Sequence, residues 1–468
     1  MNRMARRSVG AGLGLAVWLA AGGAWAKTLQ VGPGKTYAKP CAAIAAAKAG
    51  DVIEVDAGSY DGDTCAWSTD NLTVRGVGGR AKIDLTNVAP AQKKGIFTIA
   101  APNATVENFE LSGAAISVAD GNNGAGIRHQ GTNLTVRNCS FHDNQNGILG
   151  APSVDGQGAV VIESSEFANN GAGDGFSHNM YLNHYASFTL RYSYSHGAKV
   201  GHLVKTRAYQ NFILYSRITD EAGTTASYEI DAPNGGTTYL IGNLIEQAST
   251  SQNPTIVTAG EEGTTNPDQH FFFVNNTVVN DRPAGGTFVN LADGTTALLQ
   301  NNIFMGAGTV TSLAGATLKS NWTDAQGNPL LVNAAAFDDH LQPGSPCKDQ
   351  GTSAGTGLNG QSLLADYQYV HPAGTEGRAV AGAAIDIGAY ELGGAVGLDG
   401  GGGGDAGGDA AVGGDGGGGD AGGDAGGGRG VVSDDSGCGC EVTGASTTVP
   451  WLAALPALVL VLRRRRRS

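Results

Sequence analysis

The sequence predicts an all-β fold in which short parallel strands stack coil upon coil into a solenoid. Three segments of the middle of the chain align at an offset of 24 residues: SHNMYLNH (177–184), VGHLVKTRA (200–208) and TASYEIDA (225–232). Neighbouring residues of a strand face opposite sides, so each segment offers one face to a core and one to solvent. A repeat of this length is typical of a parallel β-solenoid, in which each coil packs only on its neighbours.

A second recurring phrase extends the solenoid along the chain. An apolar run, then Asn or Ser, then a bulky apolar residue recurs in steps of 24 to 33 residues and ends at Phe141, Phe167, Tyr194, Ile218, Ile245, Val278 and Phe304. Each coil therefore holds at least two strands. Asn is expected in sharp left-handed turns and in stacked hydrogen-bonding ladders. An antiparallel sandwich is disfavoured, because it lacks a constant coil period and uses two-residue hairpin loops.

The N-terminal coil carries its own signals. Ala42 to Ala49 is an alanine-rich run that predicts a short helix ended by Gly50, and Val52 to Val55 predicts the following strand. Six cysteines suit an oxidising compartment. Cys41 and Cys65 are expected to form a disulfide near this coil, whereas Cys139 is expected to be a buried free thiol.

Both ends of the chain are predicted to lie outside the solenoid, which is assigned to residues 27–392. Residues 1–26 combine Arg3, Arg6 and Arg7, a small apolar run and an Ala-Trp-Ala cleavage site, the pattern of a signal peptide. Residues 393–437 are nearly all Gly, Asp and Ala, too poor in apolar groups for a core, and are predicted to be a disordered linker.

The last segment, 438–468, has three parts: a Cys-Gly-Cys motif at its start, an apolar stretch from Val449 to Leu462, and five arginines from Arg463 to Arg467. The apolar stretch is shorter than the roughly 18–20 residues that span a bilayer. This segment resembles the MYXO-CTERM class of surface-sorting signals. The resemblance implies a sorting protease as partner, and placement at the cell envelope or outer surface with release as an alternative. A simple weak membrane anchor is the plainer alternative, and either way the membrane is contacted only through this tail.

Two segments resemble secreted proteins of the pectate-lyase-like superfamily. Residues 31–60, with their short helix, resemble the capped start of those proteins, and AAIDIGAYEL (383–392) resembles their last-coil phrase. The resemblance covers residues 28–392 and implies a right-handed parallel β-helix with a short N-terminal capping helix, expected to be monomeric. It says less about activity, because this fold hosts lyases, hydrolases, epimerases and adhesins.

The net charge of the chain restricts the kinds of molecule that it is expected to bind. The formal net charge is −13, which makes the chain a poor nucleic-acid binder. An anionic polysaccharide is still compatible with it, because a local basic patch or a bound Ca²⁺ reverses the field at one site.

The aligned segments concentrate charged and aromatic residues on one outward face of three consecutive strands, about 4.8 Å apart. The offset of 24 forms two files: Tyr181 over Lys205 over Glu229, and Asn183 over Arg207 over Asp231. The flanking residues expected to help bind a ligand are His178, His202 and Glu261, with His184 beside them. The other coils carry no comparable cluster in the sequence.

This residue set fits β-elimination of a uronate polymer. The reaction needs a base for the proton α to the carboxylate, a cation that neutralises the carboxylate, and an acid for the leaving oxygen. Lys205 is the expected base and Arg207 the carboxylate fork, with Tyr181 or His184 as acid, or Tyr181 in place of Lys205 as base. Glu229 and Asp231 are expected to hold Ca²⁺, which prefers carboxylate oxygens.

Other interpretations stay open. A glycoside hydrolase would use two carboxylates among Glu229, Asp231 and Glu261, and a C5-epimerase would use Tyr181 and His184. A non-catalytic glycan binder or adhesin would need only the surface. In the plainest interpretation, Lys over Glu and Arg over Asp are ion pairs between strands, worth roughly 0.2–1 kcal/mol each.

The histidines carry their own plain interpretation. His178 and His202 share the parity of core-facing residues, which favours a structural role for both. A zinc site is disfavoured, because the sequence shows no tight Cys/His spacing.

Overall fold

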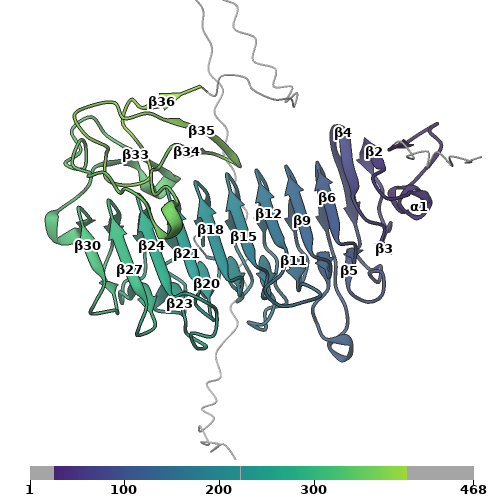
Figure 1. Cartoon of the computed structure of the whole chain (residues 1–468), viewed down its shortest axis with the longest axis horizontal. Coiled ribbons are helices and arrows are strands. Elements are labelled where there is room, and N and C mark those ends of the chain that lie inside the picture. The colour runs from purple at the N-terminus through teal and green to yellow at the C-terminus, as the bar shows by residue number, and fades with distance from the viewer. Residues whose placement is uncertain (1–25, 222, 398–468) are drawn as a thin grey trace, which may run out of the picture. The chain divides into compact units, whose positions relative to one another are not determined.

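The computed structural model describes residues 26–221 and 223–397, and it confirms the right-handed parallel β-helix with a short N-terminal helix (Figure 1). The predicted leader before residue 26, most of the predicted linker and the whole predicted sorting tail lie outside the described residues. Within the described ranges, no helix has the length and apolar character needed to cross a bilayer.

Each full coil contributes three strands, one to each of three parallel sheets. Sheet 1 has ten strands, ordered along the solenoid as β3 (Cys65–Trp67), β5 (Gly95–Ile99), β8 (Ala125–His129), β11 (Asn146–Gly150), β14 (Met180–Leu182), β17 (Val204–Thr206), β20 (Ile230–Ala232), β23 (Thr255–Ala259), β26 (Thr287–Leu291) and β29 (Thr309–Thr311).

Sheets 2 and 3 are joined through the long strand β4 (Leu72–Asp84), which pairs with both. Sheet 2 runs through β1 (Thr28–Val31), β2 (Val52–Ser59), β4, β6 (Asn103–Glu107), β9 (Asn133–Arg137), β12 (Ala159–Glu163), β15 (Ser187–Arg191), β18 (Gln210–Leu214), β21 (Thr237–Ile241), β24 (His270–Val274), β27 (Thr296–Gln300) and β30 (Thr317–Lys319). Sheet 3 runs from the end of β4 through β7 (Phe109–Ser112), β10 (Ser140–His142), β13 (Glu166–Ala168), β16 (Tyr194–His196), β19 (Arg217–Thr219), β22 (Leu244–Gln247), β25 (Thr277–Asn280), β28 (Ile303–Met305) and β31 (Trp322–Thr323).

The recurring phrase of the sequence spans the corner between sheets 2 and 3. Its last residues stack inside the solenoid, where the rings of Phe141 and Phe167 lie parallel with centroids 4.8 Å apart. One assignment is wrong by a residue: Ser195, not Tyr194, pairs with Phe167 and points inward. Tyr194 therefore faces outward on sheet 3, next to Glu166 in register.

The same corner holds the predicted ladder of stacked amides. The side chain of Asn243 donates to Asn276 at 3.0 Å, Asn276 donates to Asn302 at 3.1 Å, and Asn302 donates to Asn321 at 2.9 Å. The side chains also bond the backbone of neighbouring coils. Asn276 Oδ1 accepts from the backbone N–H of Asn243, and the side-chain nitrogens of Asn243 and Asn276 donate to the carbonyls of Ile213 and Leu240. In earlier coils serines take this position, so that Ser165 Oγ accepts from the backbone of Cys139 at 3.1 Å.

The first coil contains the predicted helix and strand, but the helix ends at Ala46 and not at Gly50, because Ala47 is already extended. Helix α1 (Pro40–Ala46) begins with a proline at its first position, where a missing N–H costs nothing. Cys41 and Cys65 form the predicted disulfide, with Cα atoms 5.7 Å apart. Cys139 is a buried free thiol, as expected, and Cys347 is a second one.

The C-terminal segment follows the last coil and packs on the outer faces of sheets 2 and 3 (Figure 1). It contains two small antiparallel sheets, β32 (Leu331–Asn333) with β33 (Asp338–Leu341), and β34 (Tyr367–Val370) with β35 (Gly374–Arg378) and β36 (Ala395–Val396). Single 3-10 turns occur at η1 (Val118–Asp120), η2 (Asp324–Gln326), η3 (Ala334–Ala336) and η4 (Leu358–Gly360).

Two expectations about the end of the fold are corrected. The segment 383–392 is not a coil of the solenoid, because its backbone bonds across the outer corner, where Asn275 Nδ2 donates to Asp386 at 2.9 Å. The last coil is instead the one formed by β29, β30 and β31. Pairing of β36 with β35 also carries regular structure beyond the predicted boundary at residue 392.

Candidate functional site

The polar residues singled out in the sequence lie on the outer face of sheet 1, in strands β14, β17 and β20. Tyr181 pairs with Lys205, as the offset of 24 predicts. Lys205 then pairs with Asp231 and not with Glu229. The outward file is therefore Tyr181, Lys205 and Asp231, and the predicted stacking of Lys205 on Glu229 and of Arg207 on Asp231 is wrong by two residues.

The loop lengths explain the shift. Seven residues, 197–203, connect β16 to β17, whereas ten residues, 220–229, connect β19 to β20. The loop 207–209 before β18 is one residue shorter than the loop 183–186 before β15, so the net change over the coil is two residues. The loop 220–229 is anchored by Asp220, whose carboxylate accepts from the backbone N–H of Ala226 at 3.1 Å. A constant offset assumes equal loops, so it fails at this coil.

Glu229 precedes β20 and points into the interior. It is fully buried, and neither carboxyl oxygen has a hydrogen-bond partner. Burial, and next to it the charge of Asp220, hold the pKa of Glu229 well above its usual range. Glu229 is therefore a neutral core residue and is not part of the outward face.

Arg207 follows β17 and donates hydrogen bonds to three other residues of the outward face. Its Nε donates to Tyr181 Oη at 2.8 Å, one Nη donates to Asn234 Oδ1, and the other donates to Glu262 Oε2 at 2.6 Å. The guanidinium is 14% exposed, so these partners largely enclose it. We call the cluster of Tyr181, Asn183, Lys205, Arg207, Asp231, Asn234 and Glu262 the Lys205 patch.

Lys205 lies between two carboxylates. Its Nζ is 3.1 Å from Asp231 Oδ2 and 3.4 Å from Glu262 Oε1, and it lies over the ring of Tyr181 at 5.6 Å from the centroid. Burial raises the pKa of Asp231 to about 6, although the charge of Lys205 opposes that rise. Asp231 is therefore a carboxyl group that changes charge near neutral pH directly beside a cation.

The remaining expected residues divide between the patch and its surroundings. Asn183 joins the patch, because its Oδ1 accepts from Tyr181 Oη at 3.4 Å. His184 turns toward Asp155, with 3.9 Å between its Nδ1 and the carboxylate. Glu261 accepts from Asn290 at 2.6 Å and from Thr258 at 3.2 Å. It therefore lies beside β23 and β26, and β23 is two strands from the β17 strand of Lys205 in the same sheet.

His178 and His202 stack inside the corner, with ring centroids 4.5 Å apart. His178 Nδ1 accepts the backbone N–H of His202 at 2.9 Å, and His202 Nδ1 accepts that of Tyr228 at 3.3 Å. Burial lowers the pKa of both rings, that of His178 to about 3. Both are neutral structural histidines, although His202 Nε2 reaches to 3.5 Å from Asp231.

The expected calcium ligands do not fit a metal site. Glu229 is a neutral carboxyl in the core, and Asp231 is engaged with Lys205. Across residues 26–221 and 223–397, no three His, Cys, Asp or Glu side chains are grouped as metal ligands. The two-carboxylate hydrolase that uses Glu229 loses its geometric basis for the same reason.

The sequence places Glu262 only at the border of the patch, in a loop over the sheet, and gives Asn234 no role, yet both contact Arg207. Both lie in turns after strands of sheet 1, where sequence pattern alone does not tell which way a side chain points. The signal for Glu262 was its place in the longest segment between two phrases, a position typical of a loop over a sheet.

A second polar cluster lies on sheet 3, under the C-terminal segment. The imidazole of His196 lies 3.3 Å from Glu166 and 3.4 Å from Glu221. Arg217 is fully buried nearby, 3.6 Å from both Glu246 and Asp339. Its cation also faces the ring of Phe337, which belongs to the C-terminal segment, so this cluster joins that segment to the solenoid.

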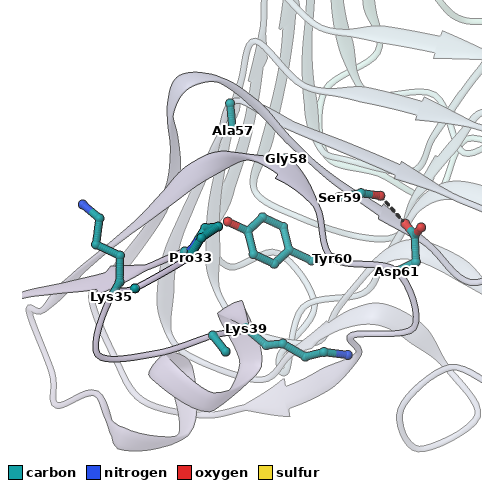
Figure 2. A pocket seen from close by; sticks show the side chains of 11 residues that line it. Pro33, Lys35, Lys39, Ala57, Gly58, Ser59, Tyr60 and Asp61 are labelled. Carbon is teal, nitrogen blue, oxygen red and sulfur yellow. Dashed lines mark hydrogen bonds between the residues drawn. The ribbon is translucent and has the colours of Figure 1, made fainter.

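A separate cavity lies far from both clusters, at the N-terminal end. It has a volume of about 420 Å³ and is lined by residues of the 32–39 loop and of β2 with the turn that follows it. Figure 2 shows Tyr60 pointing toward Pro33 and the hydrogen bond from Ser59 to Asp61. The Tyr60 hydroxyl donates to the backbone carbonyl of Asp56 at 2.8 Å.

Comparison with known proteins yields fold neighbours only. No family model matches the chain, and no curated protein matches its sequence. Among solved structures, pectate lyase Pel9A is similar at 14% identity and a TM-score of 0.45, over 75% of this chain and 90% of that one. A pectin methylesterase from Aspergillus niger is similar at 13% identity and a TM-score of 0.30, over 62% and 86%. At these levels, activity does not transfer from those proteins to this chain.

Proposed function

We propose that this chain is an exported, surface-associated β-helix protein that binds a uronate-containing polysaccharide at the Lys205 patch and cleaves it by β-elimination. One observation carries the proposal. The ammonium of Lys205 and the guanidinium of Arg207 already share one carboxylate, that of Glu262, at 3.4 and 2.6 Å. A pair of cations that binds a carboxylate on an exposed sheet face suits the carboxylate of a uronic acid.

The patch also supplies groups for proton transfer. Lys205 is ion-paired with Asp231, which suits the role of a neutralising cation. Tyr181 is better placed as the base, because Arg207 donates to its Oη at 2.8 Å and so holds that oxygen beside the cation that would bind the substrate carboxylate. We therefore favour Tyr181 over Lys205 for the proton abstraction.

The reaction balances with these groups. The Tyr181 phenolate takes the proton from the carbon α to the carboxylate, while Arg207 and Lys205 bind the developing negative charge. The electron pair of that C–H bond forms the new C=C bond as the glycosidic C–O bond breaks. The leaving oxygen receives a proton from the Tyr181 phenol, so Tyr181 returns to its starting charge.

The test uses the full chain and a panel of uronate polymers, with and without Ca²⁺, and follows the absorbance of the unsaturated product. Tyr181→Phe is expected to lower product formation at least about 100-fold, within the range for a lost general base or acid. Tyr37→Phe, in the first coil, is the matched control. Circular dichroism of each variant checks that the fold persists.

Each outcome selects one function. Product that Tyr181→Phe leaves unchanged would remove Tyr181 from the mechanism. Binding without product would select the non-catalytic glycan binder, and new reducing ends without unsaturation would select a hydrolase. Product that requires Ca²⁺ would restore the calcium-dependent mechanism, in conflict with the ligand geometry described above.

A further inference from the structure

The carboxylate in the Lys205 patch belongs to the chain itself. Glu262 lies in the turn that follows β23 (Thr255–Ala259), and its side chain reaches back across the outer face of sheet 1 to Arg207 and Lys205. The pKa of Glu262 is lowered, since the hydrogen bond from Arg207 and the charge of Lys205 outweigh the opposing effect of burial. The site that fits an anionic ligand is therefore filled by an internal anion.

Exposure is uneven across this contact. The side chain of Glu262 is 48% exposed, whereas those of Lys205 and Arg207 are 11% and 14% exposed. Solvent and any ligand thus reach the outer side of the Glu262 carboxylate first. An ion pair with one exposed partner is weak and exchangeable, so a ligand carboxylate competes with it on nearly equal terms.

The backbone under Glu262 is held by hydrogen bonds, whereas its half-exposed side chain is held only by the two ion pairs. The N–H of Glu262 donates to the carbonyl of Pro233 at 2.9 Å, and that of Gly260 donates to Ala232 at 3.0 Å. The Asn266 N–H donates to Asn234 at 3.2 Å and secures the end of the turn. Displacement of the carboxylate needs only rotation about side-chain bonds and no opening of the loop.

We propose that Glu262 is an internal competitor, which occupies Arg207 and Lys205 until a ligand carboxylate displaces it and thereby sets the affinity of the patch for acidic sugars. This inference rests on the proposed function and deepens it. A uronate carboxylate displaces Glu262 and regains the same ion pairs. A neutral or methyl-esterified sugar has no carboxylate to pair with the two cations, so the loss of Glu262 brings it no gain in affinity.

The test compares Glu262→Gln with wild type, using hexagalacturonate and its methyl ester as probes at low ionic strength. Glu262→Gln is expected to bind hexagalacturonate about tenfold more tightly, because one exposed charge-assisted contact no longer competes. Binding of the methyl ester is expected to remain weak in both proteins. Arg207→Gln added to Glu262→Gln is expected to abolish the gain.

The matched control is Asp268→Asn, which removes the same charge from the same loop. Asp268 is exposed and has a positive φ of 56°, a conformation that Asn tolerates as well as Asp. Its affinity for hexagalacturonate is expected to match wild type. An equal gain in Asp268→Asn would show a general charge effect and overturn the role of Glu262.

The outcomes distinguish a failure of this inference from a failure of the proposed function. If wild type binds hexagalacturonate and Glu262→Gln binds it no more tightly, only the role of Glu262 is overturned. If neither protein binds any acidic polymer, both the inference and the proposed function are overturned. Tighter binding of the methyl ester by Glu262→Gln would assign Glu262 to steric exclusion and overturn competition for the cations.

Discussion

At the scale of single residues, the solenoid shows how strongly surroundings decide the charge of a carboxyl group. Glu229 and Asp231 are two residues apart in the chain. The first lies unpaired in the core and is held neutral, whereas the second faces outward to Lys205 and has a pKa of about 6. Of these two carboxyls, Asp231 is the one that makes the Lys205 patch sensitive to pH near neutrality.

The pH dependence of ligand binding tests this assignment. Protonation of Asp231 below pH 6 releases Lys205 for an incoming carboxylate, so binding of hexagalacturonate is expected to tighten several-fold between pH 7 and pH 5. Asp231→Asn is expected to bind with little change over that range. Isothermal titration at constant ionic strength measures both, and an unchanged pH slope in Asp231→Asn would contradict the assignment.

His196 provides a stability test of the opposite sign. Hydrogen bonds that the ring donates to Glu166 and Glu221 outweigh burial, the largest single influence, and raise its pKa to about 9 from an ordinary value of 6.5. Because the folded pKa is the higher one, the stabilisation is complete below pH 6.5 and is lost as the pH rises through 9. His196→Gln is expected to lower the free energy of unfolding by about 1–2 kcal/mol at pH 6, and by little at pH 10.

Urea denaturation at the two pH values measures that difference. His142→Gln is the control. His142 lies in the same register as His196, two coils earlier, and its side chain is more exposed. Equal losses for His196→Gln at pH 6 and pH 10 would show that packing alone is responsible.

At the scale of elements, the corner between sheets 2 and 3 is the most regular part of the molecule. A residue with positive φ occupies the turn in successive coils, among them Asn138 at 49°, Tyr215 at 48°, Asn275 at 52° and Asn301 at 57°. The next residue points inward and joins the ladder. Each ladder amide thus satisfies backbone groups that a parallel sheet leaves unpaired where the chain turns.

Replacing one rung is expected to be costly. Asn276→Ala removes the acceptor of the Asn243 backbone N–H and of one Asn243 Nδ2 hydrogen, and it removes the side-chain donor to the carbonyl of Leu240, which is expected to destabilise the fold by about 2–4 kcal/mol. Gln350→Ala, at an exposed position with one long hydrogen bond, is expected to change stability by less than about 0.5 kcal/mol. Chemical denaturation compares the two, and similar small losses would refute a structural role for the ladder.

The sequence predicted the elements better than the surface they form. Apolar phrases and turn residues in the sequence predicted the strands and the ladder, because burial and left-handed turns strongly restrict which residue types are tolerated. The neighbours of Lys205 depended instead on loop lengths, which carry little sequence signal. The same limit hid the second cluster, since the contact of Arg217 with Asp339 joins parts of the chain far apart in sequence.

At the scale of the whole described fold, Arg217 joins the C-terminal segment to the solenoid. It is fully buried, donates to the carbonyl of Phe337 at 2.9 Å, and faces Glu246 and Asp339. Burial raises the pKa of Glu246 to about 8 and that of Asp339 to about 6. Without Arg217 both carboxyls would remain neutral at low pH and would become unpaired buried anions at high pH.

Arg217→Met is therefore expected to destabilise the protein in a pH-dependent way. The loss is expected to be about 3–5 kcal/mol at pH 8.5 and clearly smaller at pH 5.5, where the two carboxyls are protonated. Arg75→Met, which breaks the exposed ion pair with Glu54, is expected to lose less than about 1 kcal/mol at either pH. Limited proteolysis at pH 8.5 is expected to release the C-terminal segment of Arg217→Met first.

The unequal loop before β20 has a consequence for how such surfaces diversify. Its extra length changes which outward residues meet across β17 and β20, while the inward file from Val204 to Ile230 still packs without interruption. A single insertion or deletion in one corner loop thus changes which outward residues pair across two neighbouring strands, and the inward residues stay packed. In a stacked architecture, new combinations of acids, bases and cations can arise by sliding existing residues past one another, before any of those residues is mutated.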